Sequence, residues 1–133
     1  IARHCENALA VAKYLKAHDE VAWVHYSGLE GDEYYELGQK YLPKGSCGVL
    51  AFGIKGGRER SIKFMDQLKL INIATHVADS RSCLLHPASH THRQLTDEQL
   101  REAGVAPDLI RLSVGIENVD DLIADIEQAL KAM

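Results

Sequence analysis

Apolar residues recur at three- and four-residue steps through residues 1–18, the spacing of one face of an amphipathic helix. They are Cys5, Ala8, Val11, Ala12 and Leu15. Residues 21–26 form a short β-rich run that predicts a strand. A weaker helical pattern at 32–42 stops at Pro43, which cannot continue a helix. We expect the tyrosines of this passage to pack beneath it; they are Tyr34, Tyr35 and Tyr41.

Residues 47–54 are almost unbroken apolar sequence, so we expect a central strand with both faces covered. A helix running to about residue 68 follows, with Ile62, Met65 and Leu68 turned inward. Shorter apolar runs at 70–74 and 82–85 predict two more strands. The polar segment 75–81 between them is expected to cross the surface or to line a cleft.

The clearest helix signals lie in the last third of the chain. Thr96 and Gln99 have the spacing of a capping box, and Gly104 followed by Pro107 ends that helix. Asn118 is placed to cap a last helix. The apolar stripe of that helix is Val119, Leu122, Ile123, Ile126 and Leu130.

The order of these elements indicates an α/β domain. We expect a small, mostly antiparallel sheet of about four strands, with helices packed chiefly on one face. At 133 residues and 46% hydrophobic content, the chain is long enough for a single domain with its own core.

One charged side chain stands in the middle of an otherwise apolar strand. Ile110, Leu112 and Val114 alternate with Arg111 and its neighbours, so a strand here turns its aliphatic side to the core and Arg111 to the opposite face. A guanidinium presents a planar fork of N–H donors that matches a carboxylate with two hydrogen bonds. The pattern predicts either a carboxylate-binding site or a structural ion pair with an Asp or Glu residue.

Two further segments offer other chemistry. Lys55, Gly56 and Gly57 precede a helix as in a phosphate-binding loop, but the Walker and Rossmann glycine spacings are absent. The histidines at 86, 90 and 92 have a spacing that metal ligands use, yet no cysteine or carboxylate lies at ligand distance in the sequence. Hydrogen-bonding loop histidines are the favoured interpretation, and no metal site is predicted.

Composition limits the possible partners and cellular locations of the chain. The net charge is −4 and charges of both signs are interspersed, so neither nucleic acid nor an anionic membrane is implied as a partner. No apolar run approaches the roughly 20 residues of a membrane helix. Cys5, Cys47 and Cys83 sit among apolar neighbours as small buried residues would, which fits a reducing, cytoplasmic location. Because the chain opens on Ile1, we expect a processed or excised piece.

Two patterns resemble one enzyme family. The run His-Pro-Ala-Ser-His-Thr-His at 86–92 and the run Arg-Leu-Ser-Val-Gly-Ile-Glu at 111–117 resemble the carboxy-terminal domain of the Cys/Met-metabolism pyridoxal-phosphate enzymes. The segments 41–45 and 55–57, with Phe52, are also similar, so the likeness covers essentially the whole chain. Within the family the sequence is most similar to the O-acetylhomoserine sulfhydrylases.

The resemblance implies the C-terminal domain of a fold-type I pyridoxal-phosphate-dependent transferase, and it implies roles for four residues. Arg111 is expected to bind the α-carboxylate of an amino-acid substrate. His76 occupies the position of a serine that helps to hold this carboxylate in related lyases, and the amide of Val77 is a further donor. Thr91 matches a threonine close to the cofactor lysine.

The resemblance also implies what the chain lacks. Pyridoxal 5′-phosphate needs a Schiff-base lysine, normally within Ser-x-Thr-Lys, and no lysine here sits in such a motif. We therefore expect residues 1–133 to be a single C-terminal domain of a larger enzyme whose missing domain binds the cofactor. No catalytic or cofactor-binding residue is predicted in this chain, which should be inactive alone.

The implied full-length enzyme is a homotetramer that replaces the acetate of O-acetyl-L-homoserine by sulfide or a thiol, giving homocysteine or methionine. Two alternatives remain open. One is the same domain of a cystathionine or methionine γ-lyase or γ-synthase. The other is a non-catalytic binding module that keeps the fold.

Overall fold

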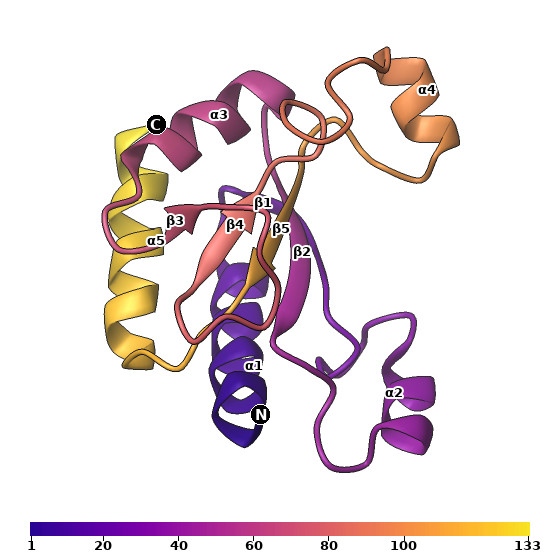
Figure 1. The fold of residues 1–133 in the computed structure, drawn as a ribbon, viewed down its shortest axis with the longest axis vertical. Helices are drawn as coiled ribbons and strands as arrows, with labels where there is room; N and C mark the ends of the chain where they lie inside the picture. The colour runs from indigo at the N-terminus through magenta and orange to yellow at the C-terminus, as the bar shows by residue number, and fades with distance from the viewer.

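The computed structural model describes residues 1–133, in which helices and strands alternate along the chain (Figure 1). The elements are α1 (Ala2–Ala17), β1 (Val21–His25), α2 (Tyr35–Tyr41), β2 (Val49–Ile54), α3 (Gly57–Gln67), β3 (Asn72–Ile73), β4 (Cys83–Leu85), α4 (Asp97–Glu102), β5 (Leu109–Ser113) and α5 (Val119–Ala132). None of the helices is long and apolar enough to cross a membrane.

The strands form one five-stranded sheet in the order β1-β2-β5-β4-β3. Three of its pairings are antiparallel, and only β3 and β4 run parallel. The expected α/β fold with a mostly antiparallel sheet is confirmed. The fifth strand is β3, a two-residue remnant of the strand predicted at 70–74, and both of its residues are exposed.

Helices α1, α3 and α5 pack together over one face of the sheet, while α2 and α4 stand apart as two small lobes (Figure 1). The core lies between the sheet and the three large helices. At its centre the rings of Phe52 and Phe64 meet edge to face, with centroids 6.0 Å apart, an arrangement that aromatic pairs prefer. The opposite face of the sheet is only partly covered.

This half-open arrangement corrects the expectation for residues 47–54. Strand β2 is an inner strand, as expected, because it pairs with β1 and β5, but only one of its faces is fully covered. Leu50, Phe52 and Ile54 are buried, whereas Val49 and Ala51 remain half-exposed on the other face. The unbroken apolar run therefore does not mean burial on both sides.

Two smaller expectations are also wrong. Ile62, expected to face inward, is 38% exposed on α3. Phe64 is the fully buried apolar residue in this part of the helix. Tyr34 and Tyr41 do not pack under their loop, because they are 54% and 67% exposed on the α2 lobe. By contrast, the capping box of α4 is present, with Thr96 and Gln99 bonded reciprocally, and Gly104 follows with a φ of +75°.

A buried carboxylate ties α5 to the segment that leads into β3. Asp125 is 6% exposed and accepts hydrogen bonds from the backbone N–H groups of Lys69, Leu70 and Ile71, each at 2.9 Å. Buried N–H groups need an acceptor, and a carboxylate is a strong one. Asp125 thus supplies the acceptors that a two-residue strand cannot.

We predict that Asp125→Ala lowers the free energy of unfolding by roughly 3 kcal/mol, because it leaves three backbone N–H groups without their acceptor, and the one from Ile71 is buried. Urea unfolding of the two proteins measures the difference. Asp121→Ala, an exposed acidic residue on the same helix, is the matched control and should cost less than about 1 kcal/mol. Equal losses in the two variants would contradict the role of Asp125.

Helices α1 and α5 are joined by a polar cluster around Glu127. Its carboxylate accepts from Tyr14 Oη, lies 2.6 Å from Lys131 Nζ and lies 3.1 Å from His18 Nε2. The hydrogen bond from Lys131, followed by that from Tyr14, lowers the pKa of Glu127 to about 2. The ionised carboxylate is thus the form that the folded chain stabilises.

A depressed pKa gives a definite pH dependence. The contribution of Glu127 to stability should be complete above its ordinary pKa of 4.5 and should be lost as the pH falls towards 2. We predict that Glu127→Gln makes the unfolding free energy less dependent on pH in this acidic window. Thermal unfolding at a series of pH values tests this, and parallel curves for the two proteins would refute it.

Candidate carboxylate-binding site

Arg111 projects from the middle of β5 onto the partly covered face of the sheet, as its alternation with Ile110 and Leu112 predicts. Its Nη2 donates to the backbone carbonyls of Thr75, at 3.0 Å, and His76, at 3.2 Å. No Asp or Glu lies within ion-pair distance of the guanidinium. The structural ion pair that the sequence left open does not form.

The remaining donors of this guanidinium have no partner in the chain. The Nε–H group is buried and makes no hydrogen bond, and Nη1 donates to no atom of the protein. A buried donor without an acceptor costs about 1–3 kcal/mol. Arg111 is therefore held in place by neutral carbonyls while its charge and part of its fork remain available.

The segment 75–78 that holds Arg111 is itself fixed from below. Cys83 Sγ donates to the carbonyl of His76 at 3.2 Å, and the amide of Ala78 donates to Ser113 Oγ at 3.1 Å. Ala78 has a φ of +59°, a left-handed conformation that a non-glycine residue adopts at a cost. Contacts from β4 and β5 thus hold a strained turn directly over the arginine.

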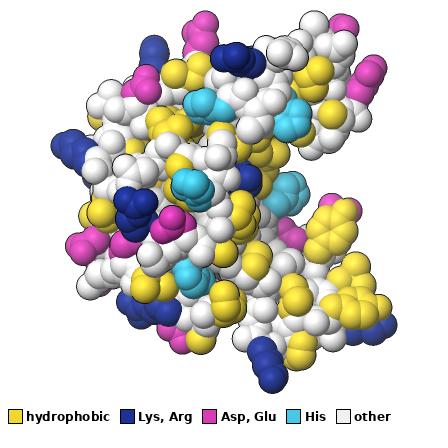
Figure 2. Space-filling view, in the orientation of Figure 1, with side chains coloured by type: hydrophobic (Ala, Val, Ile, Leu, Met, Phe, Trp, Pro, Cys, Tyr) yellow, Lys and Arg dark blue, Asp and Glu magenta, His cyan; other side chains and the backbone are white.

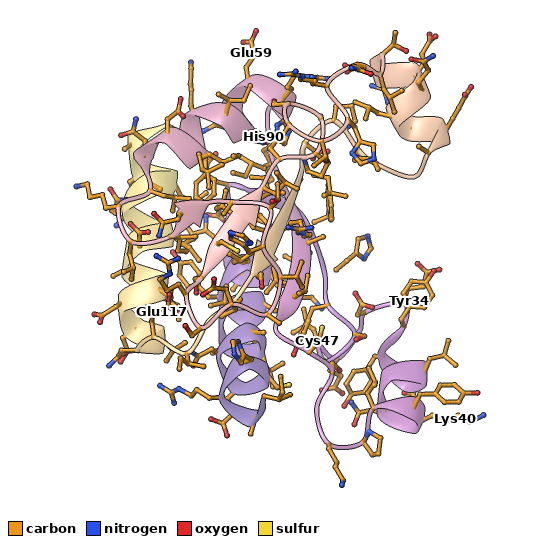
Figure 3. All side chains as sticks on the ribbon, viewed as in Figure 1. Tyr34, Lys40, Cys47, Glu59, His90 and Glu117 are labelled. Carbon is orange, nitrogen blue, oxygen red and sulfur yellow. The ribbon has the colours of Figure 1, made fainter.

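A second network anchors the far end of the same loop. The Glu117 carboxylate accepts from Ser82 N at 2.5 Å and from Ser82 Oγ at 2.9 Å, and Ser82 Oγ accepts from Gly115 N. Gly115 is required here, because a Cβ would lie 2.3 Å from the carbonyl oxygen of Ser80. Glu117 is labelled in Figure 3, where it lies at the lower end of the sheet.

Arg111 borders a hollow of about 260 Å³ on the open face. Strand pairing places His25, Ala51 and Arg111 in one row across β1, β2 and β5, and the short side chain of Ala51 leaves space between the other two. Figure 2 shows that the molecule is notched on this side, between the α4 lobe above and the α2 lobe below.

The wall opposite Arg111 contains a fixed acidic group. The side chain of Asp32 is 2% exposed, accepts from the amides of Tyr26 and Tyr34, and lies 3.5 Å from His25 Nδ1. Sequence reasoning missed Asp32 and His25, because a polar residue in a loop and a histidine near a strand end carry no motif. Only the pairing of β1 with β2 brings them to the hollow.

The other predicted site residues are placed differently from Arg111. His76 contributes its backbone carbonyl to Arg111, and its side chain is exposed. Val77 is 54% exposed, and its amide donates no hydrogen bond within the chain. Thr91 lies exposed in the loop before α4, where its hydroxyl is 2.8 Å from His92 Nδ1. No hydrogen bond joins Thr91 to Arg111.

Two alternative sites from the sequence find no support. His86 is fully buried between the carbonyl of Pro107 and Ser89 Oγ, both at 2.7 Å, and burial lowers the pKa of its imidazole. A neutral ring that donates Nε2–H to Pro107 is a structural histidine. No three His, Cys, Asp or Glu side chains are grouped as metal ligands.

At the start of α3, the basic residues are already occupied. Arg58 bonds to the carbonyl of Ala88 and the carboxylate of Asp97, and Arg60 pairs with Glu20 at 2.8 Å. These cations are committed to internal acceptors, so the glycines of residues 56–57 serve the turn into the helix.

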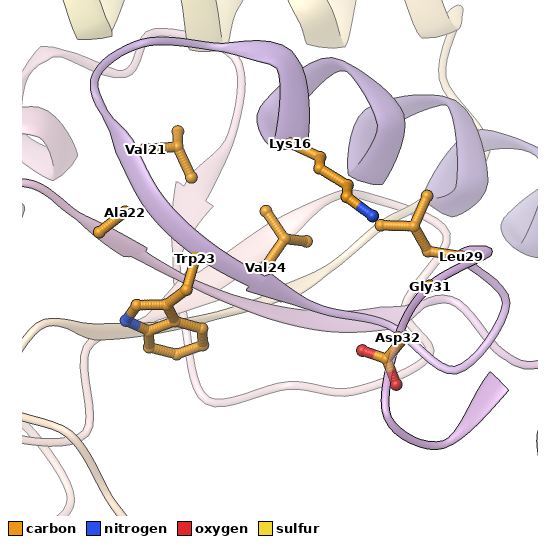
Figure 4. A pocket seen from close by; sticks show the side chains of 8 residues that line it. All are labelled: Lys16, Val21, Ala22, Trp23, Val24, Leu29, Gly31 and Asp32. Atoms are coloured by element: carbon orange, nitrogen blue, oxygen red, sulfur yellow. The ribbon is translucent and has the colours of Figure 1, made fainter.

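A separate hollow of about 280 Å³ runs along the outer edge of β1 (Figure 4). Its only cation is Lys16, whose ammonium group donates to the carbonyl of Glu30 at 3.2 Å. Although this hollow is slightly larger, it lacks a fixed donor without a partner. The chemistry therefore points to the Arg111 hollow.

Burial raises the pKa of the Cys83 thiol, although Arg111 acts in the opposite direction. We predict that Cys83 reacts with iodoacetamide about tenfold or more slowly than the half-buried Cys5 and Cys47. Peptide mapping by mass spectrometry after timed alkylation measures the three rates. Labelling of Cys83 as fast as the other two would show that segment 75–78 does not cover it.

Comparisons with known proteins agree with this architecture. The sequence matches the family described as Cys/Met metabolism PLP-dependent enzyme over residues 1–131. The chain therefore belongs to this family, whose cofactor is pyridoxal phosphate. It is 50% identical over 129 residues to homocysteine synthase of Schizosaccharomyces pombe and 46% identical over 130 residues to O-acetyl-L-homoserine sulfhydrylase of Leptospira meyeri. Each match covers 97% of this chain.

A solved structure shows the same fold. It is a putative O-acetylhomoserine (thiol)-lyase from Campylobacter jejuni that contains N′-pyridoxyl-lysine-5′-monophosphate, and it matches with a TM-score of 0.89 at 40% identity. The match covers 97% of this chain and 31% of that one. The chain thus spans about 30% of the length of the curated relatives it matches.

The residues of this chain do not fit the cofactor itself. Every lysine is exposed, and none lines the hollow beside Arg111. The described residues offer a guanidinium with unpaired donors, but no amine placed beside it for a Schiff base.

Proposed function

We propose that residues 1–133 form the substrate-carboxylate-binding domain of a pyridoxal-phosphate-dependent O-acetylhomoserine sulfhydrylase. In this proposal Arg111 binds the α-carboxylate of O-acetyl-L-homoserine. The full-length enzyme replaces the acetate at the γ carbon by sulfide or a thiol, giving homocysteine or methionine. The names of the two most similar relatives described above support this substrate class.

The observation that carries the proposal is the state of Arg111. Its guanidinium is clamped by two carbonyls, forms no ion pair and keeps a buried Nε–H without an acceptor. A bound carboxylate supplies the negatively charged acceptor that the guanidinium lacks within the chain. A purely structural arginine at this depth would be expected to have an acidic partner within the chain.

Arg111 acts by orientation. Its planar, rigid fork of N–H donors fixes the plane of a carboxylate. Holding one end of the substrate limits the positions of the α and γ carbons relative to the reacting groups, which is a large part of enzymatic rate enhancement. Pyridoxal phosphate, when bound, supplies the electron sink for the chemistry.

The remainder of the proposal concerns the rest of the protein. We infer that the Schiff-base lysine and the cofactor-binding groups lie outside residues 1–133, which form one C-terminal domain and are inactive alone. A homotetramer is the assembly proposed for the full-length enzyme. His76, Val77 and Thr91 are proposed to face the substrate only once that larger protein is complete.

We predict that Arg111→Lys in the full-length enzyme lowers kcat/KM for O-acetyl-L-homoserine by about 30-fold or more, equivalent to roughly 2 kcal/mol. A lysine cannot keep both carbonyl contacts and also present two parallel donors. Steady-state kinetics measures the effect, in which a higher KM reports lost binding and a lower kcat reports lost orientation.

Arg101→Lys is the matched control, because Arg101 is exposed on α4 and forms no ion pair. It should leave the kinetics unchanged. Absorbance of the bound cofactor confirms that both variants are loaded. If Arg111→Lys matches the wild-type kcat/KM in a loaded enzyme, the carboxylate assignment is wrong.

A second candidate function is favoured by one comparison. L-methionine gamma-lyase of Fusobacterium nucleatum is 41% identical over 129 residues. An elimination of methionine would use the same carboxylate anchor. Incubating the full-length enzyme with O-acetyl-L-homoserine plus sulfide, and separately with L-methionine, separates the two. Homocysteine from the first supports the sulfhydrylase, and a 2-oxo acid from the second supports the lyase.

A further inference from the structure

Residues 34–43, here called the α2 lobe, present large apolar side chains to solvent. Tyr34, Leu37, Tyr41 and Leu42 are 54%, 50%, 67% and 46% exposed. Figure 2 shows hydrophobic side chains gathered over this lobe, and Figure 3 shows Tyr34 and Lys40 on it, away from the sheet. Single exposed apolar residues are ordinary, but a contiguous group marks an interaction surface.

The helix inside this lobe is too short to be stable by itself. It has seven residues, and no side chain caps its first turn, whereas isolated helices below about 12–15 residues are marginal in water. Its only buried residue is Gly38, which lies close to the carbonyl of Ser27. The similarly short α4 has a complete capping box. The α2 helix therefore depends on packing that these 133 residues do not supply.

The lobe also borders the proposed substrate site. Tyr34 lines the hollow beside Arg111, and its amide is held by the buried Asp32. Any group that brings a cofactor to a substrate anchored on Arg111 has to approach this hollow. Because the lobe stands beside the mouth of the hollow, the approaching part meets Tyr34 and the apolar residues that follow it.

We propose that the α2 lobe is the docking surface for the cofactor-bearing part of the same polypeptide. This inference rests on the proposed function and adds the surface through which the two parts meet. A partner is available, since the chain covers only 29% and 30% of the two most similar relatives described above. The docked partner buries the apolar face of α2 and excludes water from one side of the Arg111 hollow.

A basic side chain, Lys40, lies next to the apolar residues of the lobe. The ammonium group of Lys40 lies 5.0 Å from the centroid of the Tyr41 ring, within the range of a cation–π contact. The face offered to the partner is thus aromatic and aliphatic, with one cation at its edge.

Photo-crosslinking in the full-length protein tests the proposal directly. Tyr41 is replaced by p-benzoylphenylalanine in a protein assembled from mixed ¹⁴N- and ¹⁵N-labelled chains, and the crosslinked peptides are mapped. We expect a crosslink to residues of the same chain outside residues 1–133. Crosslinks that join ¹⁴N and ¹⁵N peptides would assign the surface to a second copy and overturn the proposal, as would crosslinks confined to residues 1–133.

Amide hydrogen exchange supplies an independent readout in the same full-length protein. Leu37→Asp should accelerate exchange at residues 35–42 by about tenfold or more, because a docked α2 loses its packing. Ile62→Asp, an exposed apolar residue on α3, is the control and should leave these amides unchanged. If α2 already exchanges freely in the wild type, no partner covers it. Neither experiment uses substrate, so an unaltered Arg111→Lys enzyme would reject the proposed function separately.

Discussion

The arrangement of the open face depends on how one guanidinium is held without an opposite charge. Two carbonyl oxygens fix Nη2 of Arg111, and carbonyl dipoles orient a cation without neutralising it. For this to work, the segment that carries the carbonyls must be rigid. The Cys83 thiol on β4, the Ser113 hydroxyl on β5 and the Glu117–Ser82 network in the adjoining loops provide that rigidity.

Because one face of the sheet is only partly covered, it buries less apolar area, and contacts elsewhere in the fold compensate for this. The three large helices on one side bury the aliphatic face of the sheet, and Asp125 satisfies the amides that lead into the shortest strand. The other side keeps small residues, such as Ala51, in the row between His25 and Arg111. A domain built in this way has its core under one layer of helices and keeps its second face partly uncovered.

The sequence predicts correctly those features that depend on neighbouring residues. The capping box at Thr96, the cap at Asn118 and the alternation around Arg111 each depend on residues a few positions apart. Features that depend on distant partners were missed. Asp125 looks like a surface acid on a helix until amides more than 50 positions away are placed beside it. The exposure of α2 was missed for the opposite reason, because an apolar pattern predicts a buried face without saying which molecule buries it.

His76 contacts Arg111 through its main-chain carbonyl, so this contact does not depend on which side chain stands at position 76. Any residue at position 76 that permits the same backbone path leaves the anchor intact. The side chain there is free to change in size, charge and polarity without disturbing Arg111. Under the proposed function, a lineage can therefore vary the residue at position 76 and the substrates accepted there, while Arg111 keeps its place as the carboxylate anchor.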